Sequence, residues 1–488
     1  MSTRVRYAPS PTGLQHIGGV RTALFNYLFA KSSGGAFILR LEDTDQTRSD
    51  QKFVDNLYDT FSWLGLHWDE GPDKGGPFAP YIQSERLALY KRFAAELLEQ
   101  GKAYRCFCSA ERLEQVRAAR EHASESGYDR HCRSIPPDEA AERAAKGEPH
   151  VVRLKIPLGE TTRFHDQLLG DIEWRNDDVS PDPVLLKSDG FPTYHLANVV
   201  DDHLMGITHV LRAQEWLPST PLHIMLYLSF GWTPPLFCHL PMVMGQDGKK
   251  LSKRHGATSI NDFTNQGYLA EALVNYVALL GASYIEGKEL YTLEELAESF
   301  SLEKLNKAPA IFDYKKLEWY NAQYIRMTDD TRLAVIAYPY AMHANLFGCA
   351  RPTDKQRHDF FAAIPLVKER VSFLEEIPEK LVYLFSEPPL PPLEAFFPKK
   401  ADKATTITLL EWGRELVEEL ASRSDEEGEF LVKDCAETHA VKLGDLMMPL
   451  RVAITGARVS PPLFGSVRIL GAAASLARVD RALTALRT

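Results

Sequence analysis

Residues 3–43 read TRVRYAPSPTGLQHIGGVRTALFNYLFAKSSGGAFILRLED and contain three hydrophobic patterns in a row. Segment 3–8 alternates around Val5 and Tyr7 and stops at a proline, as a short strand does. In segment 20–28 apolar residues recur at i, i+3, i+4, i+7 and i+8, which is typical of one helix face, and two glycines end it. Segment 37–41 again has a strand pattern. This order predicts a βαβ unit with a parallel sheet.

Beyond this unit the chain changes character twice. Residues 105–186 interrupt the strand–helix alternation with three cysteines, a charged helical segment and polar strands, so we expect an inserted α+β domain there. The alternation resumes through 207–230, which assigns residues 1–104 and 187–256 to one α/β domain. From residue 330 onward the pattern is almost wholly helical, apart from a proline-rich connector at 387–397. The sequence thus predicts an α/β front half and an all-α rear half.

Composition limits the classes of function. The 488 residues carry a formal net charge of −10, which argues against a generic polyanion-binding protein but allows local basic patches. Six cysteines in so long a chain do not make a disulfide framework, so we expect reduced thiols and a cytoplasmic protein. Uncharged apolar stretches fall far short of the ~20 residues of a membrane span, and no secretory signal is visible.

The turn between the first strand and the first helix is suited to a phosphate group. It reads APSPTGLQHIGG at residues 8–19. Ligands bind at the carboxyl ends of parallel strands, and a helix N-terminus presents free backbone N–H groups. Gly18 and Gly19 permit close approach, and His16 can donate a hydrogen bond without a full charge. A plain turn capped by a histidine is the alternative interpretation.

A second polar stretch, GQDGKKLSKRHG at residues 245–256, begins and ends with glycine. Its basic residues are Lys249, Lys250, Lys253 and Arg254. A mobile basic loop of this kind can close over a triphosphate. Taken alone, the pattern fits a solvated surface loop equally well.

Together, the two stretches resemble the paired ATP signatures of class I aminoacyl-tRNA synthetases. Four segments resemble bacterial glutamyl-tRNA synthetases, namely RYAPSPTG at 6–13, LEDTD at 41–45, LLKSDGFPTYHLANVVDDH at 185–203 and RAQEWL at 212–217. LRVAITG at 450–456 and SPPLF at 460–464 resemble the C-terminal region of that family, so the similarity spans nearly the whole chain. One departure is Gly19, where many class I relatives have a second histidine. Glutamyl enzymes commonly have a small residue there.

The resemblance implies a Rossmann-type class I synthetase catalytic domain followed by an all-α anticodon-binding half at 330–488. The insert at 105–186 is expected to hold the acceptor end of tRNA, and residues 257–329 to form a domain that contacts the tRNA stem. The implied activity is that of a glutamate–tRNA ligase, in which ATP and Mg²⁺ activate L-glutamate as the adenylate and the glutamyl group passes to tRNA(Glu). Family behaviour implies that tRNA binds before glutamate is activated productively. We expect a monomer.

By the same resemblance, His16 and Lys253 are the catalytic residues. Adenylation is an in-line displacement that depends on positioning and charge stabilisation and needs no covalent intermediate. His16 is expected to steady the α-phosphate region, and Lys253 to meet the leaving pyrophosphate. The residues expected to bind ATP are His16, Gly18, Gly19, Glu215, Val243, Lys250, Ser252, Lys253 and Arg254.

The amino-acid pocket has to distinguish the carboxylate of glutamate from the amide of glutamine. A guanidinium fork pairs with a carboxylate at two points, whereas an amide leaves it unpaired in a dry pocket, at about 3–5 kcal/mol. Arg6 and Arg212 lie at predicted strand ends facing one crevice, and for each a structural ion pair is the alternative. The resemblance places glutamate contacts at Arg6, Ala8, Ser10, Glu42, Tyr194, Asn198 and Arg212, with Glu42 suited to the α-ammonium group.

Three cysteines of the insert point to zinc. Cys106, Cys108 and Cys132 supply three soft ligands, whereas a structural zinc takes four. Some family members complete a Cys-x-Cys and Cys-x-His set, but Ser134 occupies the histidine position here. Tyr128, four residues before Cys132, resembles a related zinc site that uses tyrosine, and His131 is also available. We predict a structural zinc site at Cys106, Cys108, Tyr128 and Cys132, with a reduced thiol cluster as the alternative.

Arg370 matches a position that the family uses near the third anticodon base, which favours glutamate anticodons. A helix-surface arginine is the alternative.

Four other functions compete with a glutamate-specific ligase. A non-discriminating enzyme would also charge tRNA(Gln), and the glutaminyl enzyme fits Arg6 poorly. A queuosine-modifying paralogue would lack the chain beyond residue 330, and a non-catalytic tRNA-binding relative should have lost His16 or Lys253.

Overall fold

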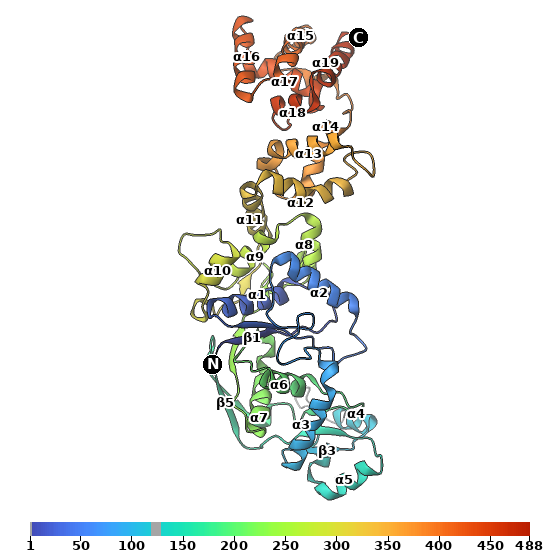
Figure 1. The fold of residues 1–488 in the computed structure, drawn as a ribbon, viewed down its shortest axis with the longest axis vertical. Helices are drawn as coiled ribbons and strands as arrows, with labels where there is room; N and C mark the ends of the chain where they lie inside the picture. The colour runs from blue at the N-terminus through green and yellow to red at the C-terminus, as the bar shows by residue number, and fades with distance from the viewer. Residues whose placement is uncertain (1, 119–127) are drawn as a thin grey trace. The chain divides into compact units, whose positions relative to one another are not determined.

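The computed structural model describes residues 2–118 and 128–488. Residues 1 and 119–127, and the side chain of Lys253, lie outside the described part. The chain divides into two compact units (Figure 1), one made of Met1–Phe263 with Leu273–Asp313 and the other of Thr264–Ala272 with Tyr314–Thr488. No described helix combines the length and the apolar character that crossing a membrane requires.

The predicted βαβ unit consists of β1 (Arg4–Tyr7), α1 (Ile17–Ser32) and β2 (Ala36–Leu39). The two strands are parallel, with Arg6 opposite Ile38. The apolar stripe of α1 is buried against the sheet, including Leu24 and Leu28, both 0% exposed. The tight return from α1 into β2 needs Gly35, because a Cβ there would lie 2.2 Å from the carbonyl oxygen of Thr3.

A second parallel pair continues the α/β pattern, as the 207–230 segment predicts. It consists of β8 (His209–Ala213) and β9 (Leu236–Leu240), joined by α7 (Thr220–Ser229). The N–H of Thr208 donates to the carbonyl of Arg4, so β8 begins beside β1. On its other edge β9 pairs with β5 (Thr161–Asp166), which forms a hairpin with β6 (Gly170–Arg175), and the strand order is β6-β5-β9-β8. A hairpin from the 105–186 segment is thus hydrogen bonded to a strand of the α/β core.

An antiparallel sheet of three strands forms the rest of the 105–186 region. Its order is β3 (Ala103–Cys106), β4 (Val151–Leu154) and β7 (Val184–Leu186). The neighbouring helices are α3 (Leu87–Glu99), α4 (Ala110–Ala118), α5 (Pro137–Ala145) and α6 (Tyr194–Leu204). A hydrophobic core that includes Leu97, Leu154, Leu196 and Leu226 joins this sheet to α3, α6 and α7. Part of the predicted charged helix, residues 119–124, falls outside the described residues.

The first unit also contains α2 (Gln51–Leu64), β10 (Val243–Met244), α10 (Leu293–Ser299) and β11 (Ala310–Ile311), and α9 (Ala270–Leu279) begins in the second unit and continues in the first. Strands β10 and β11 are parallel. Helix α8 (Ile260–Gln266) runs from the first unit into the second. The basic stretch at 245–256 therefore lies between β10 and α8.

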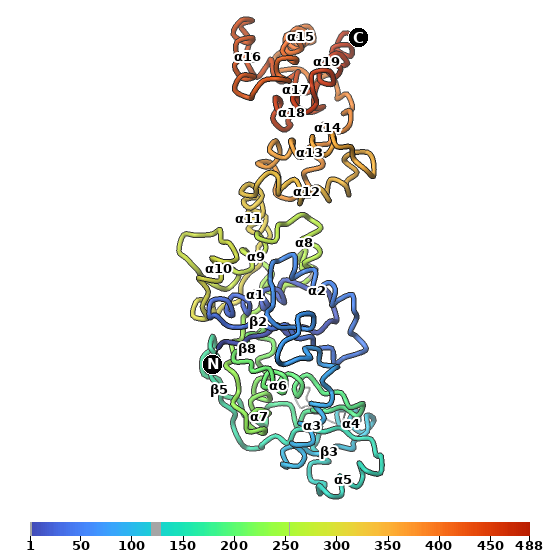
Figure 2. Tube along the Cα trace, in the orientation of Figure 1, coloured from blue at the N-terminus to red at the C-terminus, as the bar shows by residue number. Residues whose placement is uncertain are grey.

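From residue 314 onward every described element is a helix, which confirms the predicted all-α half. The helices are α11 (Tyr314–Met327), α12 (Asp330–His343), α13 (Asp354–Val367), α14 (Ile377–Phe385), α15 (Lys403–Leu420), α16 (Asp425–Thr438), α17 (Leu443–Thr455), α18 (Leu463–Leu470) and α19 (Ala472–Arg487), with short 3₁₀ turns between some of them. Helices α15 to α19 lie together (Figure 2) around one core that includes Leu409, Leu450 and Leu483. The proline-rich residues 387–392 connect α14 to this core without regular structure.

Candidate active site

His16 closes the turn between β1 and α1. Its Nδ1 accepts a hydrogen bond from the N–H of Gly19 at 3.3 Å, so the proton of a neutral ring lies on Nε2. Burial, and then the charge of Lys250, lowers the pKa of His16, which keeps the ring neutral at pH 7. A Cβ at Gly19 would lie 2.7 Å from the hydroxyl oxygen of Tyr7. The small residue at position 19 is therefore required by packing against Tyr7.

The two sequence motifs meet at the start of α1. The N–H of Ile17 donates to the carbonyl of Thr258 at 3.0 Å, and the N–H of Ile260 donates to the carbonyl of Gln15 at 3.0 Å. These two hydrogen bonds flank an antiparallel bridge between His16 and Ser259. The basic stretch that ends at Gly256 is thus anchored to the His16 turn.

Within the 245–256 loop, His255 holds the backbone in place. Its Nδ1 accepts from the N–H of Ser252 at 3.0 Å, and its Nε2 lies 3.1 Å from a carboxylate oxygen of Asp247. A Cβ at Gly245 would lie 2.7 Å from the same ring, so this glycine is needed for close approach. The sequence analysis did not select His255 or Asp247. The glycines at the two ends of the loop were the sequence feature that could have indicated close packing of its backbone against another side chain.

Several of the expected ATP-binding residues come together here. The ammonium group of Lys250 contacts the carboxylate of Glu215, and both charges act on the pKa of His16. Val243 is buried in β10, where its carbonyl accepts from the N–H of Leu251 at 3.0 Å. The backbone of Lys253 begins the short 3₁₀ helix Lys253–His255, but its side chain lies outside the described part.

A buried cluster of opposite charges lies at the carboxyl ends of β1 and β2. Asp202 accepts from Arg6 at 3.0 and 3.2 Å and from Arg40 at 2.7 Å. Arg40 also donates to Glu42 at 2.9 Å, and all four residues are at most 7% exposed. Burial raises the pKa of Glu42 although Arg40 opposes it. For Asp202, burial acts upward too, but Arg6 and Arg40 outweigh it and lower the pKa.

Other expected glutamate contacts adjoin this cluster. The N–H of Glu42 donates to the carbonyl of Pro9 at 3.0 Å, which ties the loop carrying Ala8 and Ser10 to the end of β2. Asn198 is buried, and its Nδ2 lies 3.4 Å from an oxygen of Glu42. The loop after β1, the end of β2 and helix α6 therefore meet around Glu42.

Arg212 differs from Arg6 and Arg40 in the kind of partner it has. It lies near the end of β8, is 4% exposed, and donates to the hydroxyl of Tyr194 at 3.2 Å. Its other partners are also uncharged at pH 7, and no ion pair within 2–118 and 128–488 joins it to a carboxylate. Burial lowers its pKa, and the charge of Arg6 acts in the same direction. The fork of Arg6 is thus occupied by Asp202, whereas Arg212 is a buried cation without an anion in contact.

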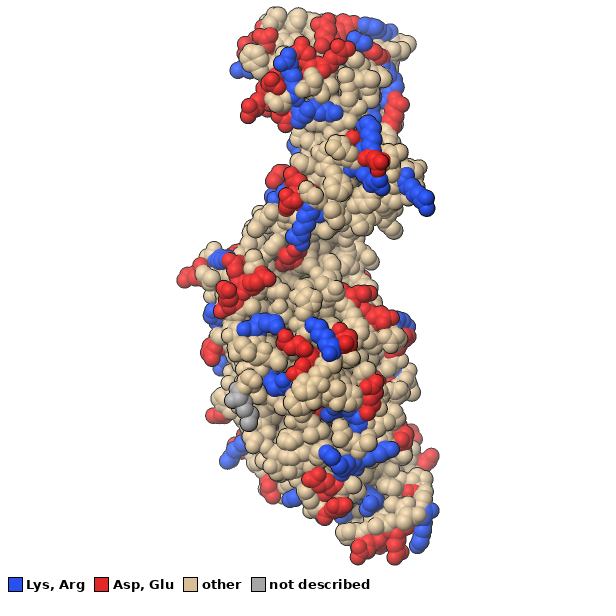
Figure 3. Space-filling model, viewed as in Figure 1, with Lys and Arg blue, Asp and Glu red and all other residues tan. Residues whose placement is uncertain are grey.

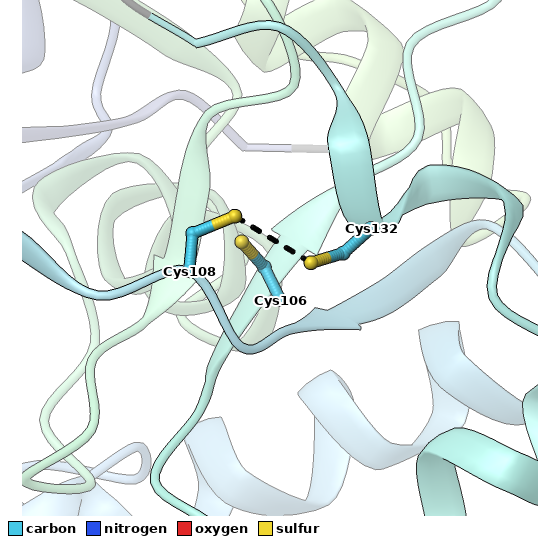
Figure 4. Close-up of side chains that lie close together, drawn as sticks. All are labelled: Cys106, Cys108 and Cys132. Atoms are coloured by element: carbon cyan, nitrogen blue, oxygen red, sulfur yellow. Dashed lines mark hydrogen bonds between the residues drawn. The ribbon is translucent and has the colours of Figure 1, made fainter. Parts of the chain in front are cut away.

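The three cysteines selected from the sequence also come together. The ligand atoms of Cys106, Cys108 and Cys132 all lie within 4.8 Å of one another (Figure 4), and the Cys108 and Cys132 sulfurs are 3.6 Å apart. The Tyr128 hydroxyl accepts from the N–H of Cys132 at 3.3 Å and bonds to the side chain of Cys106. No histidine of the described residues belongs to the set, so His131 does not join it. The three thiols match three of the four ligands that a structural zinc takes, and the Tyr128 hydroxyl lies beside them.

The charge state of this cluster is compatible with metal binding. Burial, followed by the neighbouring Cys106, raises the pKa of Cys108 to about 12, and burial raises the pKa of Tyr128. Without a metal the Cys108 thiol therefore holds its proton at pH 7, and a bound cation would displace it. Burial acts upward on the pKa of Cys106 as well, but hydrogen bonding, first of all with Tyr128, outweighs it and lowers the pKa. The geometry is therefore compatible with a bound zinc ion. It is equally compatible with a metal-free cluster of reduced thiols.

Arg370 lies in the helical unit, at the end of a short 3₁₀ helix after α13. Its side chain is exposed. Its charge contributes, after burial, to a lowered pKa of Arg451. On the face drawn in Figure 3, basic and acidic side chains are interspersed, which agrees with the near-balanced composition.

Comparison with known proteins decides the family. A model described as "tRNA synthetases class I (E and Q), catalytic domain" matches residues 2–319, and one described as "Anticodon binding domain" matches residues 332–483. The glutamate–tRNA ligase of Treponema denticola is 53% identical over 502 residues, covering 99% of each chain. The chain belongs to the glutamate–tRNA ligase family. The corresponding ligase of Borreliella burgdorferi is 49% identical, over 100% of this chain and 99% of that one.

A solved structure agrees with this assignment. The glutamate tRNA ligase from Elizabethkingia meningosepticum, in complex with its amino acid, has a TM-score of 0.87 and 35% identity over the full length of both chains. Membership of the glutamate–tRNA ligase family confirms the predicted class I fold, the helical anticodon-binding part and the expectation of a ligase.

Proposed function

We propose that the chain attaches L-glutamate to the 3′-terminal adenosine of tRNA(Glu), with glutamyl-adenylate as the intermediate. The observation that carries this proposal is Arg212, a buried cation whose partners in the described part of the chain are all neutral. A guanidinium in that state favours a ligand with a carboxylate side chain over one with an amide. The helix N-terminus at His16 favours a phosphate group nearby.

ATP is assigned to the region where the His16 turn and the 245–256 loop are joined. His16, Gly18 and Gly19 would face the α-phosphate, and Glu215 and Val243 the ribose and adenine. Lys250, Ser252, Lys253 and Arg254 would meet the polyphosphate. Positive charge on this loop would stabilise the pyrophosphate as it leaves. Mg²⁺ bound to the ATP substrate would neutralise part of the triphosphate charge.

Glutamate is assigned to the crevice at the ends of β1, β2 and β8. Arg212, with Tyr194, would receive the side-chain carboxylate, and Arg6, whose fork is occupied by Asp202, would line the same site. Glu42 would receive the α-ammonium group. Ala8, Ser10 and Asn198 would line the remaining contacts. Arg40 supports the proposed glutamate site because it donates hydrogen bonds to both Glu42 and Asp202 and compensates their buried charges.

The decisive experiment is ATP–pyrophosphate exchange with the purified chain, with and without tRNA(Glu). We expect exchange that requires glutamate and is stimulated by tRNA(Glu). Glutamine in place of glutamate should give at least 100-fold less exchange, since it leaves Arg212 unpaired. An absence of glutamate-dependent exchange under both conditions would refute the proposal.

The tRNA scope is a separate part of the proposal. With Arg370 near the third anticodon base, the chain should charge purified tRNA(Glu) and leave tRNA(Gln) uncharged. Equal charging of both would establish a non-discriminating enzyme. The proposal further assigns acceptor binding to 105–186, stem contact to 257–329 and anticodon binding to 330–488, in a cytoplasmic monomer. Sedimentation of the purified chain tests the monomer.

Zinc is proposed at Cys106, Cys108, Tyr128 and Cys132. The convergence of three sulfurs and a phenol supports it. When bound, the metal would crosslink β3 to the segment before α5 and supply no chemistry to the reaction. Elemental analysis of the protein purified without chelator should give one zinc per chain, and less in Cys132→Ser. A metal-free protein with unchanged thermal stability on zinc addition would favour the thiol cluster.

A further inference from the structure

Five hydrogen bonds surround the guanidinium of Arg212. Nε donates to Nε2 of His239 at 3.1 Å, Nη1 to the Tyr194 hydroxyl and to Nδ1 of His223, both at 3.2 Å, and Nη2 to Oγ1 of Thr220 at 2.8 Å and to the Trp216 carbonyl at 3.3 Å. These bonds come from β9, α6, α7 and the turn after β8. Of these residues only Tyr194 was predicted from the sequence to contact glutamate.

The pattern of donors determines which nitrogen of each imidazole carries the proton. Because the Nε2 atom of His239 accepts from Arg212, its proton lies on Nδ1, which faces an oxygen of Asp166 at 2.6 Å. Because the Nδ1 atom of His223 accepts from Arg212, its proton lies on Nε2, which faces Nδ1 of His195 at 3.1 Å. The arginine and its neighbours thus form one directed network.

Asp166 anchors one end of the network. It is 0% exposed, and besides His239 it accepts from the backbone N–H groups of Leu168 and Leu169 at 3.0 and 2.9 Å. It lies at the end of β5, where it pairs with β9. The carboxylate nearest to Arg212 on this side is therefore one imidazole ring away from it, close enough to orient His239 but not in contact with the fork.

The groups that directly contact Arg212 in this network are all neutral. His223 and His239 are 1% and 0% exposed, and burial lowers the pKa of both, as well as that of His195. A neutral acceptor fixes the position of a guanidinium and leaves its charge uncompensated. A carboxylate in contact fixes the position and also neutralises the charge. Arg6 shows the second case, since Asp202 contacts its fork.

We propose that His239, Thr220 and His223 form a neutral shell that holds Arg212 rigid and unpaired, that Asp166 positions His239 within it, and that this shell sets the preference for a carboxylate over an amide. The inference rests on the proposed function, because it assigns a purpose to the surroundings of the arginine that would read glutamate. The shell acts through Arg212 and touches no reacting atom. It therefore governs affinity for the amino acid and leaves the use of ATP unaltered.

A matched pair at position 223 tests the charge of the shell. In both Asn and Asp, Oδ1 can take the place of the imidazole Nδ1 that faces Arg212, but only Asp brings a charge. His223→Asn should raise the KM for glutamate less than about 10-fold, with the KM for ATP unchanged. His223→Asp should raise the KM for glutamate at least 100-fold and increase the use of glutamine relative to glutamate. Equal effects of the two substitutions on glutamate would overturn the proposal.

A second pair tests the positioning without introducing charge. Thr220→Val keeps the shape of the side chain and removes the acceptor that lies 2.8 Å from Arg212. It should raise the KM for glutamate about 10-fold at constant KM for ATP. Thr220→Ser keeps the acceptor and should recover most of that loss. If Val and Ser behave alike, or if both KM values rise together, the shell has only a structural role.

The two proposals fail in different ways. Wild-type protein without glutamate-dependent exchange would refute the proposed function itself. Active wild-type protein in which the members of each pair are indistinguishable would refute only the role of the shell. Melting temperatures of the four variants identify any that fail to fold, and the pair at the other position then decides.

Discussion

The buried charge cluster around Arg212 and the loop at 245–256 both contain several charged side chains, but these are buried in the cluster and exposed on the loop. In the cluster, the residues Arg6, Arg40 and Arg212 are at most 4% exposed and each is held by several hydrogen bonds. On the loop the side chains of Lys250 and Arg254 are 61% and 60% exposed. Buried charges cannot reorient or be screened, so they can select a ligand, whereas exposed charges attract polyphosphate without fine selection.

The largest loss of stability should follow from removing the charge of Arg40 from the buried cluster. Arg40→Met leaves Glu42 and Asp202 buried with less compensation, which costs about 3–5 kcal/mol of stability. The melting temperature of the first unit should fall by on the order of 10 °C. Arg48→Met is the matched control, because its ion pair with Asp45 is 73% exposed on the arginine side and should change stability little. Similar melting temperatures for both variants would contradict a buried charge cluster.

The loop should matter for catalysis instead of stability. Lys253→Ala should reduce pyrophosphate exchange about 100- to 1000-fold, the usual effect of removing one group that stabilises transition-state charge. tRNA binding and melting temperature should stay near the wild-type values. Lys249→Ala, on the same loop, should lose less than about 10-fold by the same principle. Equal exchange in Lys253→Ala and wild type would remove Lys253 from the mechanism.

The stability of the folded chain should fall at acid pH because of the buried histidines near Arg212. Burial, and then the charge of Arg212, lowers the pKa of His195 to about 4, whereas an unfolded chain has a histidine pKa of about 6.5. Between these values the unfolded chain binds a proton that the folded chain does not, so stability falls as pH drops from about 6.5 to about 4. His195→Gln should flatten this part of the curve of melting temperature against pH. An unchanged slope would show that His195 is protonated in the folded chain.

The smallest effect should come from the exposed pair between Lys250 and Glu215. Lys250→Met should change the free energy of unfolding by less than about 1 kcal/mol, because both partners are largely solvated. The same variant should raise the KM for ATP, and high salt should reduce that difference. A loss of stability like that of Arg40→Met would mean that the loop is part of the structural core.

Local pattern was sufficient to predict much of the fold. The strand, helix and strand at 3–41 follow from hydrophobic periods of 2.0 and 3.6 and from glycines, and the all-α half follows from helical periodicity beyond residue 330. The 161–175 hairpin was harder to assign. It lies inside the segment that reads as an insert, yet it pairs with β9. Pairing between distant strands leaves no local signal.

The sequence by itself determined which chemical groups are available and where phosphate-binding backbone occurs. The His16 turn and the glycine-bounded basic loop could be identified because close approach and local charge are encoded by neighbouring residues. Only the tertiary structure decided which arginine is paired. Asp202 reaches Arg6 across 196 positions of sequence, and Asp166 reaches His239 across 73. A guanidinium's electrostatic state depends on which groups surround it in space, and those groups come from β9, α6, α7 and the turn after β8, elements that are separate in the sequence.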